Sequence, residues 1–428
     1  MRPNSTAEKI LNFVKRLIPR NLFKKIQPIY HYFLALLSAI VYRFPSRYIK
    51  VIAITGTKGK TSTAEVVNAI LEEAGYKTAL AGTLRFKVGE QEERNLFKMT
   101  MPGRFFVQNF LHRAVKAGCD FAILEMTSEA AKVFRHKFIE FDALLFTNLS
   151  PEHIESHGSF ENYKKAKLSL AKALTSSPKR PRILIANSDD PHAKDFLAFD
   201  ADIKKTYSLK DGEPYNLEKN KTVFMFGGAP LEAHLYGIFN LSNILAGIAF
   251  AKTLGVSDDA IRHAIQNFKG IRGRVERVNA GQEFDVIVDY AHTVDSLEKV
   301  YGVFEGSRKI CILGGTGGGR DTRKRPAMGR VASENCEKII LTDEDPYDED
   351  PKKIVSDIMG GIPKGKAEII MDRRKAIAKG LKYAKKGDAV IITGKGTDPY
   401  IMGPNGTKTP WDDADVAREE LAKLGFKK

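Results

Sequence analysis

Residues 56–62 have the composition of a phosphate-binding loop, and they are the part of the chain best suited to chemistry. A β-branched apolar run at 51–54 leads into a turn that contains Gly56 and Gly59, and an apolar-periodic stretch follows. This order predicts a strand, a loop and a helix. Glycines let backbone N–H groups approach phosphate oxygens, and the start of a helix adds positive potential. We therefore predict a nucleotide-binding loop in which Lys60 reaches the β/γ-phosphates and the Thr61 hydroxyl holds Mg²⁺. The predicted nucleotide-binding residues are Gly56, Thr57, Lys58, Gly59, Lys60, Thr61 and Ser62.

Two further groups stand where predicted strands end. Glu125 closes an apolar run at 121–124, and His153 follows a second apolar run at 142–147. Open α/β sheets build their sites at the carboxyl ends of strands. A carboxylate and an imidazole at adjacent strand ends suit a Mg²⁺ site beside phosphates. Alone, each residue would more often be a helix cap or a loop contact, but beside the phosphate loop a metal role is the better interpretation.

Alternating strand and helix patterns must position these groups. We predict strands at 49–54, 79–83, 120–126, 142–147 and 182–186, and helices at 61–75, 104–117, 160–175, 240–252 and 257–267. A second set of strands falls at 285–290, 309–314, 338–342, 367–371 and 388–393. This alternation predicts the α/β class, with a mostly parallel central sheet and a Rossmann-like C-terminal sheet. A glycine-containing hinge at 270–273 divides the chain into a helical segment at 1–48, a central ATP-binding domain at 49–271 and a C-terminal domain at 272–428.

The segment before the first strand is basic and apolar. Residues 8–26 mix the two types, and residues 29–42 are almost wholly apolar. The apolar run is shorter than the roughly 20 residues that a membrane span needs, and no clean small-residue cleavage site of a signal peptide follows it. We retain two interpretations. The segment is a helix buried against the next domain, or a basic amphipathic helix that contacts the inner membrane face through residues 8–42.

Composition narrows the functional classes. The chain has 428 residues and a net charge of +16, which suits nucleic acid, anionic nucleotide substrates or an acidic membrane surface. We find no helix-turn-helix, zinc-finger or aromatic RNA-binding pattern, so we expect no nucleic-acid partner. The three cysteines, Cys119, Cys311 and Cys336, are few and widely spaced. From them we expect no disulfide framework, no cysteine-based zinc site and a cytoplasmic location.

Further motifs resemble the Mur ligase family, in its MurE type. The phosphate loop has only two residues between Gly56 and Gly59, a short form that few ATPase families use. The stretches that carry the resemblance follow one another in the family's order, at 147–158, 161–167, 237–246, 273–277, 289–293, 314–326 and 394–396. The resemblance covers the chain from about residue 49 to its end.

The resemblance implies an ATP-dependent amide ligase. In such enzymes the acceptor carboxylate takes the γ-phosphate of ATP, and an incoming amine then displaces phosphate from the acyl phosphate. The implied catalytic residues are Lys60, Lys167, His153 and Glu125, and the implied Mg²⁺ site comprises Thr61, Glu125, His153 and a carbamylated Lys167. The implied nucleotide contacts outside the loop are Asn240 and Asn243 at the adenine, with Arg274, Asp289 and Tyr290. The implied acceptor and amino-acid contacts are Thr100, Thr127, Ser128, Arg135, Arg320, Asp345, Tyr347, Gly394 and Asp398, and Lys324 and Arg325 are also expected to face anionic groups.

Three departures from the family pattern bear on the substrates. The uridine-binding N-terminal domain of the MurE type has no counterpart in residues 1–48. The amino-acid-selecting Asp-Asn-Pro-Arg of the family becomes Glu-Asp-Pro-Tyr at 344–347. Tyr347 cannot form the bidentate ion pair that the arginine makes with the far carboxylate of meso-diaminopimelate. Asp398 stands where the family has a longer glutamate.

The sequence thus predicts an ATP- and Mg²⁺-dependent ligase of peptidoglycan precursor synthesis, which adds a free amino acid to a UDP-N-acetylmuramoyl-dipeptide-like acceptor. Two alternatives stay open. One is a Mur-like ligase for a different, lipid-linked carboxylate acceptor, and the other is a nucleotide-binding partner subunit without catalysis. The presence of Lys60, Thr61, Glu125, His153 and Lys167 argues against the second alternative.

Overall fold

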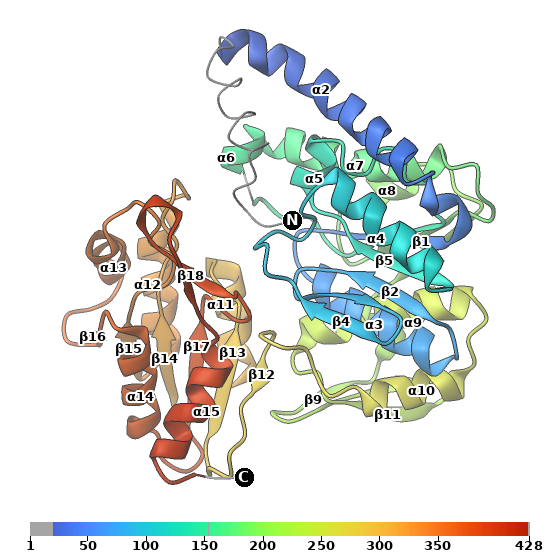
Figure 1. Ribbon diagram of the computed structural model, residues 1–428. Coiled ribbons are helices and arrows are strands. Elements are labelled where there is room, and N and C mark those ends of the chain that lie inside the picture. The colour runs from blue at the N-terminus through green and yellow to red at the C-terminus, as the bar shows by residue number, and fades with distance from the viewer. Residues whose placement is uncertain (1–19, 153, 427–428) are drawn as a thin grey trace.

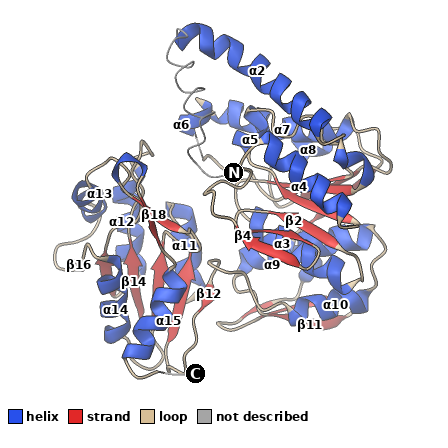
Figure 2. Cartoon of the chain, in the orientation of Figure 1, coloured by secondary structure: helices blue, strands red, loops and turns tan. Residues whose placement is uncertain are grey.

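The structure is a computed structural model that describes residues 20–152 and 154–426. Among these residues the chain forms two helix-covered sheets that lie side by side, with a long helix across the top of the first (Figure 1). Figure 2 shows that strands lie inside each half and helices outside. The predicted α/β class is therefore confirmed.

The first sheet has eight strands within the described residues, in the order β4-β3-β2-β5-β1-β6-β7-β8. Strands β2, β5, β1, β6, β7 and β8 are parallel, whereas β3 and β4 pair antiparallel at one edge. Five of these strands match predicted ones, but β3, β4 and β8 were not predicted. The strands are β1 (Lys50–Thr55), β2 (Thr78–Ala81), β3 (Arg85–Val88), β4 (Gln91–Arg94), β5 (Phe121–Glu125), β6 (Ala143–Phe146), β7 (Ile183–Asn187) and β8 (Ile203–Tyr207).

Both faces of this sheet are buried, which explains the continuous apolar runs of its strands. Along β1, Val51 and Ala53 pack into one core, and Ile52 and Ile54 pack into the other. The first core is covered by α4 (Arg104–Lys116), α5 (Ser128–Lys132), α7 (Phe160–Thr175) and α8 (Ala193–Leu197). The second is covered by α3 (Lys60–Glu73), α9 (Ile238–Thr253) and α10 (Asp258–Asn267). The short α6 (Ile154–His157) precedes α7, and a small antiparallel sheet follows β8, with β9 (Asn216–Leu217), β10 (Thr222–Phe226) and β11 (Ala229–Ala233).

The second sheet has six strands within the described residues, in the order β12-β13-β17-β14-β15-β16. All its pairings are parallel except that of β12 with β13. Its strands are β12 (Glu276–Arg277), β13 (Asp285–Asp289), β14 (Lys309–Leu313), β15 (Lys338–Leu341), β16 (Ala367–Ile369) and β17 (Ala389–Thr393). The helices α11 (Val294–Val303), α12 (Lys324–Asn335) and α13 (Pro351–Met359) cover one face, and α14 (Arg373–Tyr383) and α15 (Asp413–Lys423) cover the other. A hairpin of β18 (Tyr400–Met402) and β19 (Lys408–Pro410) precedes α15.

The described residues before the first sheet, 20–48, form a long helix and a short turn. The helix α2 (Arg20–Val41) packs on α4, and a short 3-10 turn at Pro45–Tyr48 leads into β1. This agrees with the helix predicted at 29–42. The basic stretch at 8–19 lies outside the described residues. Within the described part of the chain, no helix is long and apolar enough to cross a membrane.

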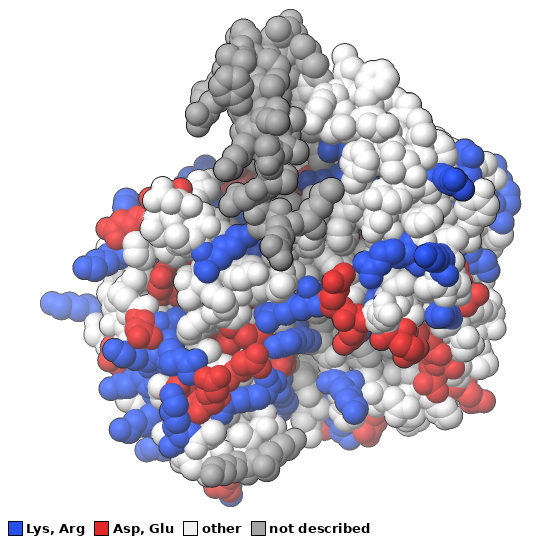
Figure 3. All heavy atoms as spheres, viewed as in Figure 1, with Lys and Arg blue, Asp and Glu red and all other residues white. Residues whose placement is uncertain are grey.

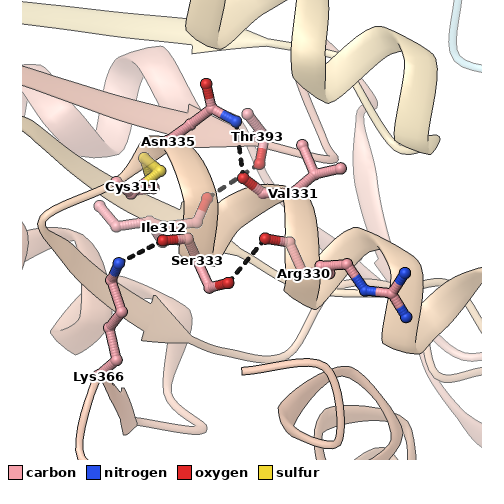
Figure 4. Close-up of a disulfide and its surroundings, with 9 residues drawn as sticks. Cys311, Ile312, Arg330, Val331, Ser333, Asn335, Lys366 and Thr393 are labelled. Atoms are coloured by element: carbon pink, nitrogen blue, oxygen red, sulfur yellow. Dashed lines mark hydrogen bonds between the residues drawn. A yellow bond between two sulfur atoms is a disulfide. The ribbon is translucent and has the colours of Figure 1, made fainter. Parts of the chain in front are cut away.

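The expectation of no disulfide is wrong, because Cys311 and Cys336 are bonded (Figure 4). Cys311 lies in β14, and Cys336 follows α12 just before the neighbouring parallel strand β15. The helical crossover between two adjacent parallel strands returns the chain to its starting level, so the two Cα atoms are 6.1 Å apart despite a sequence separation of 25. Wide spacing in the sequence was therefore a poor guide to distance in this fold.

Candidate active site

The predicted phosphate loop connects β1 to α3, whose N-cap residue is Gly59. Gly56 and Gly59 have φ angles of 154° and 81°, which favour glycine. Space is equally restrictive, since a Cβ atom on Gly56 would lie 1.9 Å from Thr147 Oγ1 and one on Gly59 would lie 2.3 Å from Asn243 Oδ1. The loop is fixed from the side, because the Lys58 backbone N–H donates to Asn148 Oδ1 at 2.9 Å. These contacts hold the loop in one shape before any nucleotide arrives.

Buried oxygen atoms gather beside the start of α3. The Thr61 hydroxyl donates to Glu125 Oε2 at 2.9 Å, and the backbone N–H of Thr83 donates to Glu125 Oε1 at 2.7 Å. The Thr83 hydroxyl also donates to Glu125 and lies 2.9 Å from the Thr100 hydroxyl. Burial raises the pKa of Glu125, and the contacts with Thr83, Lys60 and Thr61 oppose that shift.

This oxygen pair fits a magnesium ion. Among the described residues no cluster of three or more histidine, cysteine, aspartate or glutamate side chains is placed to hold a metal. Mg²⁺ needs no such cluster, because one or two protein oxygens together with substrate phosphates usually suffice. Thr61 and Glu125 are the described residues that would hold the ion. His153 lies outside the described residues.

Two lysine side chains converge on the loop. Lys60 Nζ donates to the carbonyl oxygens of Gly56 and Thr57, each at 2.8 Å. Lys167 Nζ, from α7, donates to the same Gly56 carbonyl at 2.6 Å and lies 4.8 Å from the centre of the Tyr163 ring. Burial lowers the pKa of Lys60 to about 8. Burial, and then the charge of Lys60, lowers the pKa of Lys167 well below its usual value.

The asparagine pair lies at the start of α9, next to the loop. Gly237, not an asparagine, is the N-cap residue of this helix. Asn243 Nδ2 donates to Asn240 Oδ1 at 3.2 Å, and Asn243 Oδ1 accepts from the Thr63 hydroxyl at 3.3 Å. Both side chains are buried. A cap role, which Asn residues often have, therefore does not account for them.

The hinge region carries Arg274 against the C-terminal sheet. Its guanidinium lies 4.6 Å from the centre of the Tyr290 ring. Asp289 accepts from the backbone N–H groups of Val275 and Ala291 at 2.7 and 2.6 Å, and burial raises its pKa. Val275 has a φ of 49°, which is unusual for a β-branched residue. Asp289 thus holds a strained hinge, and this role was not visible in the sequence.

A cavity of about 440 Å³ lies between the two halves of the molecule. Its wall on the first half includes Lys58 and Glu152, whose side chains form an ion pair at 2.7 Å. Its wall on the second half includes the predicted residues Tyr290, Arg320, Asp345, Tyr347, Gly394 and Asp398, together with His292 and Lys324. Burial lowers the pKa of His292 to about 3. The His292 ring is therefore neutral at physiological pH, and it gives the cavity wall a polar but uncharged group.

An ion network crosses this cavity. Lys98, from the loop before α4, forms ion pairs with Asp345 at 2.7 Å and with Asp398 at 3.0 Å. Lys395 is fully buried and pairs with the same two carboxylates at 2.8 and 3.4 Å. Tyr347 has a φ of 53° and lies with its ring centre 6.0 Å from Lys98 Nζ. The two carboxylates, which the lysines hold in place, also line the cavity, where a further ammonium group can reach them.

Four of the predicted acceptor contacts lie elsewhere. Thr100, Thr127, Ser128 and Arg135 do not line the described cavity. The Thr127 hydroxyl caps α5 by accepting from Ala130 N–H at 3.1 Å, and Ser128 Oγ lies 3.1 Å from His157 Nε2. The Arg135 guanidinium donates to the Met101 carbonyl, and its buried Nε has no hydrogen-bond partner among the residues that the structure describes.

One expectation is wrong and two residues were missed. Arg325 does not face a ligand, because it is buried in ion pairs with Glu349 and Asp357. Lys98 lines the cavity and Thr83 contacts Glu125, but neither residue was predicted. Thr83 follows the end of β2 and Lys98 stands two residues before Thr100, so strand ends and neighbouring motifs were weak signals for both.

Comparisons with known proteins identify the family of this chain. Residues 54–251 match the Mur ligase middle domain, and residues 273–396 match the Mur ligase glutamate ligase domain. The UDP-N-acetylmuramoyl-L-alanyl-D-glutamate--2,6-diaminopimelate ligase of Syntrophomonas wolfei is 35% identical over 402 residues, 91% of this chain and 81% of that protein. The UDP-N-acetylmuramyl-tripeptide synthetase of a Roseiflexus species is also 35% identical, over 92% of this chain and 82% of its own length.

Solved structures show the same architecture. A UDP-N-acetylmuramoyl-L-alanyl-D-glutamate--2,6-diaminopimelate ligase superposes with a TM-score of 0.61 at 29% identity, covering 88% of this chain and 79% of that chain. The folylpolyglutamate synthase of Mycobacterium tuberculosis, solved with ADP, shares the fold with a TM-score of 0.67 at 15% identity, covering 92% of this chain and 94% of that chain. The chain therefore belongs to the Mur ligase family of ATP-dependent acid–amino-acid ligases, and within it to the MurE type.

Proposed function

We propose that this protein joins the amino group of a free amino acid to a carboxylate of a UDP-N-acetylmuramoyl-dipeptide-like acceptor, at the expense of ATP. One observation carries the proposal. A single cavity has the phosphate-loop residue Lys58 on one wall and the paired carboxylates Asp345 and Asp398 on the other. A carboxylate substrate activated at the loop would therefore meet an ammonium-binding site within the same cavity.

The chain's own residues account for the chemistry of each half-reaction. In the first, an acceptor carboxylate oxygen attacks the γ-phosphorus of ATP and ADP leaves. Lys60 and the backbone N–H groups of the loop neutralise charge on the transferred group. Thr61 and Glu125 would hold a Mg²⁺ ion, which would supply positive charge to the phosphates during the transfer. In the second half-reaction the amine attacks the acyl carbon and inorganic phosphate leaves. Asp398 and Asp345 would orient that amine.

The cations on the cavity wall bear on which amino acid is taken. Tyr347 stands where the family has an arginine, so this position offers no bidentate partner to a distant carboxylate. Arg320 and Lys324, however, line the same cavity. Burial lowers the pKa of Lys324, which Glu344 partly restores. We propose that these two side chains, rather than residue 347, meet any second carboxylate of the substrate.

The decisive experiment measures phosphate release with ATP, Mg²⁺, UDP-N-acetylmuramoyl-dipeptide and a panel of amino acids, with products weighed by mass spectrometry. A mass gain of one amino-acid residue on the dipeptide supports the proposal and names the amino acid. Lys60→Ala, which removes the loop cation, should abolish turnover. A wild-type protein that binds ATP but gives no product with any amino acid would exclude this acceptor and favour a lipid-linked one.

We further propose that Lys167 reacts with CO₂ to form a carbamate. Burial lowers the pKa of its amine well below the usual value, which favours the neutral form that adds to CO₂. The amine nitrogen bonds to the carbon of CO₂ and releases a proton to solvent, and the product is an anion beside the Lys60 cation. Lys167→Ala should lower turnover, and acetate or propionate should restore part of it. The exposed Lys165 on the same helix provides the control, since Lys165→Ala should change nothing. Loss of activity without rescue would contradict the carbamate.

A cytoplasmic setting at the inner membrane face is part of the same proposal. The described portion of residues 8–42 supports it with one feature, an apolar helix face exposed to solvent.

A further inference from the structure

The helix α2 exposes large apolar side chains to solvent, whereas a helix of a water-soluble domain usually buries them. The helix packs on α4, and its most buried residues are small: Ala35, Ser38 and Ala39 are at most 1% exposed. Its outer face carries the large apolar side chains. The exposed fractions there are 58% for Ile29, 62% for Phe33, 49% for Leu37, 53% for Ile40 and 54% for Val41. An ordinary amphipathic helix buries such residues.

These exposed side chains form one continuous stripe. Positions 29, 33, 37 and 41 are four apart, so they lie above one another on a helix. Tyr32, which is 42% exposed, and Ile40 flank the stripe. The stripe spans about 18 Å at 1.5 Å per residue. In Figure 3 the described surface at the upper right is white over a continuous area, so few charged side chains interrupt it there. Contiguous apolar patches of this kind mark interaction sites.

The charge of the surrounding sequence indicates what covers the stripe. Residues 1–50 contain ten lysine and arginine residues and a single acidic residue, Glu8. Arg43 and Arg47 follow α2 directly, and both are exposed. An apolar face bordered by basic residues is the composition of helices that lie in the plane of an anionic membrane surface. No described helix can cross a bilayer, so the contact would be peripheral.

We propose that the apolar stripe of α2, made of Ile29, Tyr32, Phe33, Leu37, Ile40 and Val41, rests in the surface of an anionic lipid bilayer. The helices of one face of the central sheet would then face the membrane, since α2 packs on α4. Figure 1 shows α6, which follows the cavity residues Ser150 and Glu152, on that same side. This inference gives substance to the membrane part of the proposed function, but it does not depend on the ligase reaction.

The test is co-sedimentation of the full-length protein with vesicles, without ATP or acceptor. Vesicles of phosphatidylcholine with 30% phosphatidylglycerol should carry down the protein, and pure phosphatidylcholine vesicles should carry down at least ten-fold less. The variant Ile29→Ser/Phe33→Ser/Leu37→Ser should lose at least ten-fold of the binding to anionic vesicles. The matched control Leu217→Ser/Ile369→Ser/Leu424→Ser removes three exposed apolar side chains from other elements and should bind like the wild type.

A second measurement covers the case of a variant that does not fold. Phe33→Trp keeps the stripe apolar, and its fluorescence should shift to the blue on binding and be quenched by brominated lipid. Wild-type protein that stays in the supernatant with every vesicle overturns the proposal. So does a stripe variant that binds as well as the control. A lipid-free dimer that the stripe substitutions dissociate, in a protein without vesicle binding, would instead assign the face to a second copy of the chain. Because the assay contains no substrates, its failure leaves the ligase proposal untouched.

Discussion

Removal of the Lys98 side chain should show how much the contact between the two halves of the molecule contributes to activity. Lys98 belongs to the first half of the molecule, yet its Nζ pairs with Asp345 and Asp398 of the second half at 2.7 and 3.0 Å. These two carboxylates raise the pKa of Lys98 against the effect of burial. The three side chains are only 15%, 6% and 14% exposed, so solvent screens the pairs little.

The magnitude follows from what remains after Lys98→Met. A hydrogen bond to a charged group contributes about 1.5–3 kcal/mol, and stripping a buried carboxylate of its partner costs about 3–5 kcal/mol. Here Lys395 still pairs with both carboxylates, so the lower range applies. We expect a loss of about 2 kcal/mol in the free energy that holds the two halves together. At 1.4 kcal/mol per factor of ten, this is roughly a thirty-fold smaller ratio of closed to open molecules.

The assay is steady-state kinetics with ATP and the acceptor saturating and the amino acid varied. For Lys98→Met we expect kcat/KM to fall about thirty-fold, whereas Lys116→Met, an exposed lysine on α4, should change nothing. The double variant Lys98→Met/Asp398→Asn should lose less than the sum of the single losses, with a coupling energy of about 1–2 kcal/mol. Activity within two-fold of the wild type, or strict additivity in the double variant, would refute the reasoning.

Two further predictions concern the phosphate loop. The pKa of Lys60 in the protein without nucleotide is about 8, and bound phosphates would raise it. Above pH 8, ATP binding is therefore accompanied by the uptake of a proton. ATP affinity should therefore be constant below pH 8 and weaken by up to ten-fold per unit above it, as measured by calorimetry. Lys60→Arg, which does not titrate in this range, should show no such decline, and a flat wild-type profile to pH 9.5 would count against the assignment. Gly59→Ala should weaken ATP binding at least ten-fold, because its Cβ would lie 2.3 Å from Asn243 Oδ1. Gly75 has a similar φ of 86°, but a Cβ atom there would meet open space. Equal effects of Gly59→Ala and Gly75→Ala would therefore show that backbone strain, not the clash, is responsible.

Local patterns identified the elements that carry the nucleotide site. The strands β1, β5 and β6 each contain an uninterrupted run of four apolar residues because both faces of the sheet are buried, and this leaves a strong signal in the sequence. The phosphate loop was also predicted from the sequence. Its glycines are required by the backbone conformation of the loop itself, which involves only a few neighbouring residues. Edge strands were missed for the opposite reason. The strand β4 reads Gln-Glu-Glu-Arg, is largely exposed and carries no apolar period.

The sequence by itself determined the sheet scaffold, the loop at 56–62 and the family, because these depend on interactions between residues close together along the chain. Tertiary structure alone decided which distant groups meet. Lys98 and Asp345 are separated by 247 positions, and no local pattern relates them. Arg325 has the composition of a ligand-binding residue, yet neighbouring acids bury it. On α2 the small residues Ala35, Ser38 and Ala39 are buried, while large apolar side chains face outward. The packing of α2 on α4 decides this orientation, because the sequence records the side chains but not the partner surface.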